Sequence, residues 1–151
     1  FEFMKPYNIS RDKMMKLLDF VWHNSSLIIP QDFEIKETLQ ELKDAKYNIH
    51  IISNRTRETH KEVIEWLNRW DFPYDSIILI SNSFVSKTDF PIDYYIDDSP
   101  IFADDFYKVK TIEKILYLRD HPWNRNVKES ENIVRVYSVR DAIDKILERD
   151  S

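Results

Sequence analysis

The sequence predicts an α/β fold built on a largely parallel sheet. Short apolar segments of strand length alternate along the chain with amphipathic helices, an order typical of helices packed on a parallel sheet. Polar residues also follow the predicted strands at their carboxyl ends, where sheets of this kind bind ligands. The 151 residues suit a single domain, and we find no repeat or linker that indicates a second one.

The first half of the chain contains three predicted helices and two predicted strands. A helix from Ser10 to His23 follows from apolar residues that recur every three or four positions after a plausible N-cap serine. Apolar runs too short for helices indicate the strands. The remaining elements are a helix opened by Pro30 and Asp32, a strand from Asn48 to Ile52, a helix from Glu58 to Trp70 and a strand from Ser76 to Ile80.

The second half contains three further predicted strands and a final helix. The strands are expected at Tyr94 to Ile96, Ile115 to Leu118 and Ile133 to Tyr137. The helix begins near Ser138, and apolar residues at helical spacing from Val139 onward give it one face to bury.

Composition excludes several classes of protein. A net charge of −5 argues against a protein that coats nucleic acid or an anionic membrane. No uncharged run reaches the roughly 18 residues of a membrane span, and no signal-peptide pattern opens the chain. The absence of cysteine excludes disulfides and thiolate sites, and the absence of glycine excludes glycine-rich phosphate loops. We therefore expect a cytoplasmic protein with no membrane partner.

Polar clusters follow four of the predicted strands. Because the carboxyl ends of parallel strands lie at one edge of a sheet, these clusters predict a binding site there. They are Ser53-Asn54-Arg55, Ser81-Asn82-Ser83, Asp97-Asp98 and Arg119-Asp120.

The adjacent carboxylates of Asp97 and Asp98 are the first candidate for chemistry. Two neighbouring carboxylates repel each other unless a cation offsets their charge, and hard oxygen ligands of this kind suit Mg²⁺. The alternative is a solvated loop in which Asp98 or Ser99 caps the following helix.

The loop after the strand at Asn48 to Ile52 is the second candidate. The hydroxyl of Ser53, the backbone amides of the turn and the guanidinium of Arg55 could together hold a phosphate. The alternative is an ordinary turn, in which Thr56 or Thr59 caps the next helix and Thr59 to Glu62 form a capping box. Lys87 lies between two predicted strands, and a lysine without a predicted partner is usually exposed to solvent.

Read in order, these segments resemble motifs two, three and four of the haloacid dehalogenase (HAD) superfamily of hydrolases. The segments are Ile49-His50-Ile51-Ile52-Ser53, then Lys87, then Tyr94-Tyr95-Ile96-Asp97-Asp98. In the 5'(3')-deoxyribonucleotidase (5'-nucleotidase type C) branch, a lysine lies ten residues before a paired Asp, as Lys87 does here, and residues 118–125 also resemble that branch. The resemblance implies a three-layer, Rossmann-like α/β core over residues 31–151 and a small helical cap over residues 1–30.

The resemblance also implies an activity, that of a Mg²⁺-dependent phosphatase. Its substrate would be a nucleoside monophosphate or a similar small phosphoester. Ser53 and Lys87 would act in catalysis, and Asn54 and Arg55 would join them around the phosphate. Asp97 and Asp98 would place the Mg²⁺ ion. A polynucleotide 3'-phosphatase of the same superfamily is the near rival, and the lack of a basic stripe argues against nucleic acid as a partner.

The chain departs from the family pattern at its amino terminus. The family's first motif, Asp-x-Asp, supplies the nucleophile from a central strand that precedes the cap helix, and nothing before Ser10 provides it. We expect that the sequence lacks an N-terminal segment of the natural protein. The alternatives are a homo-oligomer or other partner that donates the strand, and a non-catalytic relative that binds phosphate or protein. A generic α/β domain with a coincidental motif order is the remaining alternative.

Overall fold

The computed structural model describes residues 8–81, 84–108 and 113–150. Its internal contacts divide the chain into two compact units, Phe1–Ser83 and Phe84–Ser151. The predicted α/β class and parallel pairing are confirmed: β1 pairs with β2 in the first unit and β3, β4 and β5 pair in the second, all in parallel. The expected division into a cap over residues 1–30 and a core over residues 31–151 stays a prediction.

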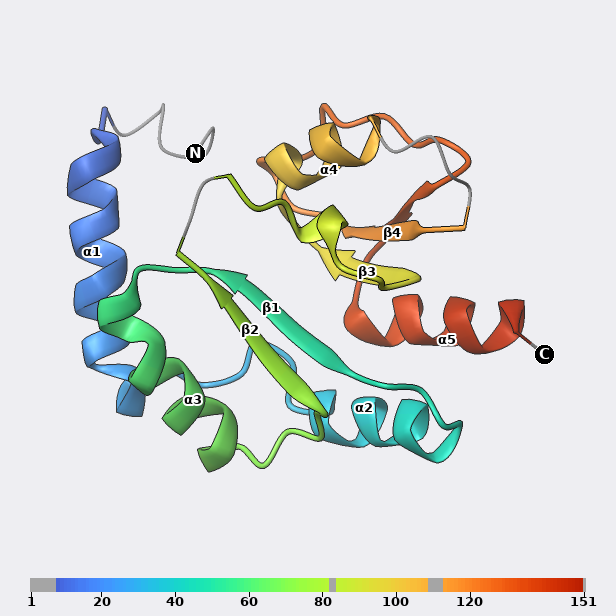
Figure 1. The fold of residues 1–151 in the computed structure, drawn as a ribbon, viewed down its shortest axis with the longest axis horizontal. Coiled ribbons are helices and arrows are strands. Elements are labelled where there is room, and N and C mark those ends of the chain that lie inside the picture. The colour runs from blue at the N-terminus through green and yellow to red at the C-terminus, as the bar shows by residue number, and fades with distance from the viewer. Residues whose placement is uncertain (1–7, 82–83, 109–112, 151) are drawn as a thin grey trace. The chain divides into compact units, whose positions relative to one another are not determined.

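The described part of the first unit contains two parallel strands and three α-helices, and one of these helices connects the two strands. Helix α3 connects β1 to β2 and lies beside them (Figure 1). The α-helices and strands of this unit are α1 (Arg11–His23), α2 (Ile35–Asp44), β1 (His50–Asn54), α3 (His60–Arg69) and β2 (Ser76–Ile80).

Several features expected in this unit differ from the structure. Strand β1 begins and ends two residues later than expected, because its pairing with β2 runs from His50 to Asn54 and includes polar residues that apolar content alone does not reveal. Helix α2 begins at Ile35 because the Asp32 carboxylate accepts the amide of Glu34 in a turn. The capping box considered as an alternative at Thr59 does not form, since the Thr59 hydroxyl donates to the Thr56 carbonyl instead, at 3.2 Å.

The amino-terminal segment packs on α3. The indoles of Trp22 and Trp66 meet edge to face with their centroids 6.0 Å apart. The Trp66 indole also donates to the carbonyl of Ile28 at 2.8 Å, and the Arg69 guanidinium donates to the carbonyl of Ser25 at 3.0 Å. Helix α1 and the segment after it are therefore anchored within the first unit.

Two helices of this unit are followed by a residue with positive φ, in the left-handed backbone region, although the chain has no glycine. After α2, Lys46 has φ 70°, and the Tyr47 amide donates to the Leu42 carbonyl at 2.9 Å. After α3, Asp71 has φ 50° in the same arrangement. Both ends form Schellman motifs, in which glycine is the usual residue because any side chain is strained there.

We predict that Lys46→Gly raises the free energy of unfolding by about 0.5–1 kcal/mol, because glycine removes the strain of a side chain at positive φ. Lys46 is exposed, so the substitution removes no buried contact. Urea denaturation measures the change. Lys46→Ala is the control and should give no gain, since alanine keeps a Cβ; an equal gain in both variants would contradict the explanation.

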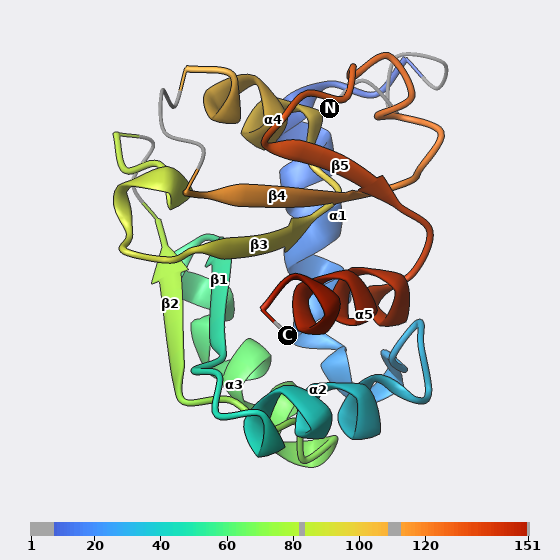
Figure 2. The ribbon, with the colours of Figure 1, turned by 90° about the vertical axis from the view of Figure 1, so that its right-hand side faces the viewer.

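The second unit is a three-layer arrangement of helix, sheet and helix. Its strands β3 (Tyr94–Asp97), β4 (Ile115–Arg119) and β5 (Ile133–Val136) lie in sequence order. Helix α4 (Pro100–Phe106) lies on one side of this sheet and α5 (Val139–Arg149) on the other, as Figures 1 and 2 both show. Because side chains alternate between the two faces of a strand, each face of the sheet has side chains that pack against one of these helices.

The core of the second unit lies between α4 and the sheet. Rings from α4 and β3 pack edge to face, with Tyr95 5.3 Å from Phe102 and 5.4 Å from Phe106 between centroids. This cluster of buried residues consists of Tyr95, Phe102, Ala103, Phe106, Leu116, Leu118 and Ile133. Ser99 caps α4 by accepting the Phe102 amide at 3.3 Å, which confirms the cap considered for the helix after Asp98.

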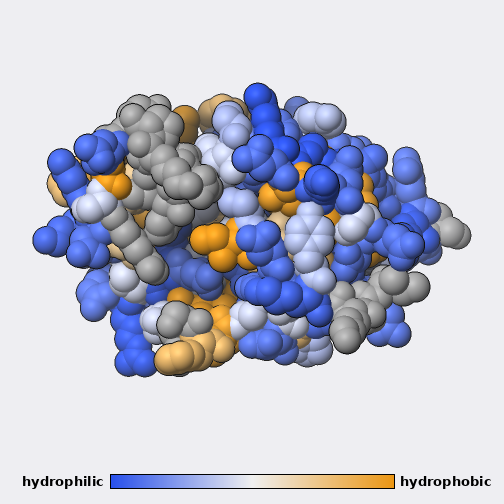
Figure 3. Space-filling view, turned by 90° about the horizontal axis from the view of Figure 1, so that it is seen from above, coloured by the Kyte–Doolittle hydropathy of each residue, from blue (hydrophilic) through white to orange (hydrophobic). Residues whose placement is uncertain are grey.

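The surface mixes charged residues with separate groups of apolar ones, as the face in Figure 3 shows. Among the described residues, Phe20, Leu27 and Phe84 are large apolar side chains that remain exposed. In the same part of the chain, none of the helices combines the length and the apolar character that crossing a membrane requires.

Candidate functional site

A shielded ion pair stands at the carboxyl end of β3. The ammonium of Lys87 contacts one carboxylate oxygen of Asp97, and the two side chains are only 14% and 13% exposed. The other oxygen of Asp97 accepts the Ser99 amide at 2.8 Å. The expectation that Lys87 alone would be solvated is therefore wrong, because folding brings it against a carboxylate ten residues away.

Local structure holds Lys87 in this position. It begins a short 3-10 helix, Lys87–Asp89, which Ser86 and Asp89 close in a capping box. The Tyr95 hydroxyl donates to the carbonyl of Lys87 at 3.0 Å, and burial raises the pKa of Tyr95 to about 12. The Lys87 ammonium also lies 5.3 Å from the centre of the Phe102 ring. Strand β3 and helix α4 thus fix both the backbone and the charge of Lys87.

The next residue, Asp98, is held in place by hydrogen bonds to its backbone carbonyl. Its carbonyl accepts the Trp123 indole at 3.2 Å and the Asn124 amide at 2.9 Å. Its half-buried carboxylate makes no hydrogen bond or ion pair with the residues that the structure describes. The site therefore contains one carboxylate committed to a lysine and one that is available.

These two carboxylates fit part of a magnesium site. Mg²⁺ is commonly bound through one or two carboxylates together with water and substrate phosphate. Within residues 8–81, 84–108 and 113–150, no three histidine, cysteine or acidic side chains gather to form a complete metal site. Asp97 and Asp98 can thus supply at most two of the ligands.

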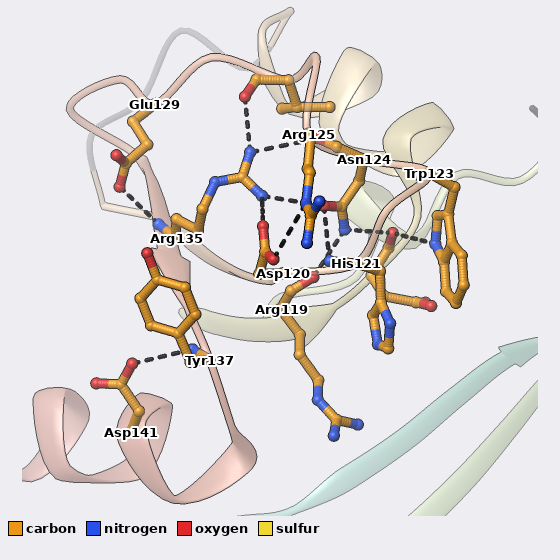
Figure 4. A network of polar contacts seen from close by, with 12 residues as sticks. Arg119, Asp120, His121, Trp123, Asn124, Arg125, Glu129, Arg135, Tyr137 and Asp141 are labelled. Carbon is orange, nitrogen blue, oxygen red and sulfur yellow. Dashed lines mark hydrogen bonds and ion pairs between the residues drawn. The ribbon is translucent and has the colours of Figure 1, made fainter.

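The segment after β4 surrounds the same strand end with a polar network (Figure 4). Asn124 is fully buried at its centre. Its amide group donates to the carbonyls of Asp98 and Arg119 at 2.9 and 2.7 Å, and its side-chain oxygen accepts the His121 amide at 3.1 Å. The rings of His121 and Trp123 stack with centroids 4.2 Å apart.

Arg135 on β5 completes this network. Its guanidinium pairs with Asp120 at 2.8 Å and donates to the side-chain oxygen of Asn124 at 3.0 Å. It also donates to the carbonyls of Asn124 and Val127 at 3.2 and 2.8 Å. The sequence analysis singled out Asp120 and residues 118–125, which include Asn124, but missed Arg135. The available signal was a single charged residue inside a short apolar strand.

The other predicted site residues, Ser53, Asn54 and Arg55, lie in the first unit. Ser53 and Asn54 are the last residues of β1, Ser53 half-buried and Asn54 exposed. The guanidinium of Arg55 lies 4.1 Å from the centre of the Trp22 ring on α1. Burial lowers the pKa of Arg55 to about 10, although Asp19 lies near enough to oppose that shift.

One hydrogen-bond donor of the Arg55 guanidinium is unsatisfied. Its Nε is buried and has no hydrogen-bond partner among residues 8–81, 84–108 and 113–150, whereas its backbone amide donates to the Ile80 carbonyl at 2.8 Å. A buried donor without a partner is costly, which is consistent with a site that receives an acceptor from a ligand or from water.

The predicted site residues thus fall into two groups. Lys87, Asp97 and Asp98 are brought together in the second unit, and Ser53, Asn54 and Arg55 follow one another in the first. That both groups act on one phosphate stays a prediction. In the cluster after β2, Asn82 and Ser83 lie outside the described residues.

Comparison with known proteins finds a distant relative. A curated protein of Oceanobacillus iheyensis named "Putative nucleotidase OB0422" is 29% identical to the chain over 107 residues. The match covers 65% of this chain and 53% of that protein, so the chain spans about half the length of the curated relative it matches. No family model and no solved structure matches the chain.

Proposed function

We propose that this chain carries part of the active site of a Mg²⁺-dependent phosphatase of the HAD type, a nucleotidase that hydrolyses nucleoside monophosphates or similar small phosphoesters. The observation that carries the proposal is the shielded pair of Lys87 and Asp97 directly before Asp98 at a strand end. The distant likeness to a protein named as a nucleotidase supports the same class of reaction. A nucleotide partner and a cytoplasmic location belong to this proposal.

The residues of the site would work by positioning and by charge neutralisation. The ammonium of Lys87, oriented by Asp97, would face the negative charge of the phosphoryl group. The hydroxyl of Ser53 would donate to a phosphoryl oxygen, and Asn54 and Arg55 would add donors around it. Asp97 and Asp98 would place Mg²⁺, one as a direct ligand and the other through water or a hydrogen bond, and the ion supplies further neutralisation of the phosphate when it is bound.

This chemistry needs a nucleophile that the chain does not contain. No Asp-x-Asp sequence occurs anywhere in the 151 residues. We propose that an Asp-x-Asp strand from another segment of the natural protein, or from a partner chain, supplies it. The second candidate function is a phosphate-binding module without turnover.

The test is an assay of phosphate release by the natural gene product. Intact-mass determination first shows whether that product extends beyond these 151 residues. We expect Mg²⁺-dependent release of phosphate from nucleoside monophosphates and loss of release with EDTA. Binding of a nucleoside monophosphate without release would support the binding module, and absence of both binding and release would exclude both functions. Preferential release from DNA 3'-phosphate ends would instead indicate a polynucleotide phosphatase.

A further inference from the structure

Asn124 connects the ends of two neighbouring strands. Strands β3 and β4 pair from Tyr94 and Ile115 to a last pair of Asp97 and Leu118. The next residues, Asp98 and Arg119, lie just beyond that pairing. Asn124 donates one hydrogen bond to the carbonyl of each of them, at 2.9 and 2.7 Å. A single buried side chain thus bridges the two strands where their own ladder stops.

The rest of the network holds the Asn124 side chain in one orientation. Its oxygen accepts the His121 amide at 3.1 Å and the Arg135 guanidinium at 3.0 Å. Because all its hydrogen-bonding groups are used and it is fully buried, rotation of its amide would leave several polar groups without partners. Its two donors therefore point reliably at the two strand ends.

We propose that Asn124 is a positioning residue that fixes the backbone of Asp98, and through it the placement of the Asp97 and Asp98 carboxylates. Asp98 follows Asp97 directly, and the Asp97 carboxylate accepts the amide of Ser99 on the far side of Asp98. A shift of the Asp98 peptide would therefore change both carboxylates. The consequence for metal binding rests on the proposed function, whereas the placement of the backbone does not.

The variant Asn124→Asp separates positioning from general support. An aspartate keeps an oxygen that can accept from His121 and Arg135 but lacks the amide hydrogens that Asp98 and Arg119 receive. Asn124→Ala removes both halves of the interaction. Ile143→Ala is the matched control for lost stability, because Ile143 is fully buried on α5 and takes no part in the network.

The decisive measurement is amide hydrogen exchange with NMR chemical shifts in the whole chain. We expect Asn124→Asp and Asn124→Ala to speed exchange at the Ser99 amide at least about tenfold more than at core amides of β4, and to shift the carboxyl ¹³C signals of Asp97 and Asp98. Ile143→Ala should leave this local signature unchanged. A Ser99 amide and carboxyl signals that change no more in the two Asn124 variants than in Ile143→Ala would overturn the proposal.

A second measurement addresses the metal and is read separately. If the wild-type protein shows Mg²⁺-dependent phosphate release, Asn124→Asp should raise the Mg²⁺ concentration for half-maximal activity about 10- to 100-fold, as loss of groups that support metal ligands usually does. An unchanged Mg²⁺ requirement in that variant would contradict the proposal. Absence of release in the wild type would count against the proposed function, and the NMR comparison would still decide the role of Asn124.

Discussion

Replacing Lys87 by methionine is expected to lower Mg²⁺-dependent phosphate release by the natural protein about 10²- to 10³-fold, the usual effect of removing one preorganised group that stabilises transition-state charge. Methionine keeps much of the length of the side chain and removes its charge. Lys87 is shielded from water, so little solvent screens its charge from a phosphate. Steady-state assays with a nucleoside monophosphate measure the effect, and Lys108→Met, on a lysine that is 75% exposed, should leave the rate unchanged.

The same substitution also breaks a shielded ion pair, so its effects on activity and stability must be separated. Lys87→Met leaves the Asp97 carboxylate without its cation, which should destabilise the fold by about 3 kcal/mol. The double variant Lys87→Met with Asp97→Asn removes both charges and should recover most of that stability. We expect its activity to stay as low as that of Lys87→Met. Because Asp97 also belongs to the proposed magnesium site, recovery of activity together with stability would show that neither Lys87 nor Asp97 acts in the reaction.

Replacing Arg135 by methionine is expected to destabilise the protein by about 3–5 kcal/mol, the usual cost of breaking a buried ion pair. The Arg135 and Asp120 side chains are only 15% and 19% exposed. Loss of the guanidinium also removes the donor to the carbonyl of Val127, whereas the carbonyl of Asn124 keeps the Val127 amide at 3.0 Å. Chemical denaturation monitored by tryptophan fluorescence measures the change.

A matched control for this prediction exists on the same carboxylate. Arg125 also pairs with Asp120, at 3.6 Å, but its side chain is 67% exposed. Arg125→Met removes the same charge from the same partner and should cost at most about 1 kcal/mol, because solvent screens an exposed pair. Similar losses of stability in the two variants would show that burial and the additional hydrogen bonds of Arg135 do not matter.

Periodicity and local signals predicted most of the regular structure. Strand β2 has the predicted limits, Ser10 caps α1 as expected, and α5 begins next to the predicted start at Ser138. Those features depend on neighbouring residues, which the sequence shows directly. The shifted limits of β1 depend on its partner strand, 26 residues further along the chain, and so escaped prediction.

For the candidate site, too, some features could be predicted from the sequence and others could not. From the sequence alone we predicted the α/β class, which the structure confirms, and the position of Asp97 and Asp98 at the end of a strand. The chemistry of these groups stays a prediction. Only the tertiary structure decided that Lys87 is shielded against Asp97, that Arg135 neutralises Asp120, and that Asn124 ties Asp98 to Arg119. The physical reason is that the pKa, burial and hydrogen bonding of a polar group are set by atoms distant in sequence, whereas helix caps and strand patterns are set by residues close to it.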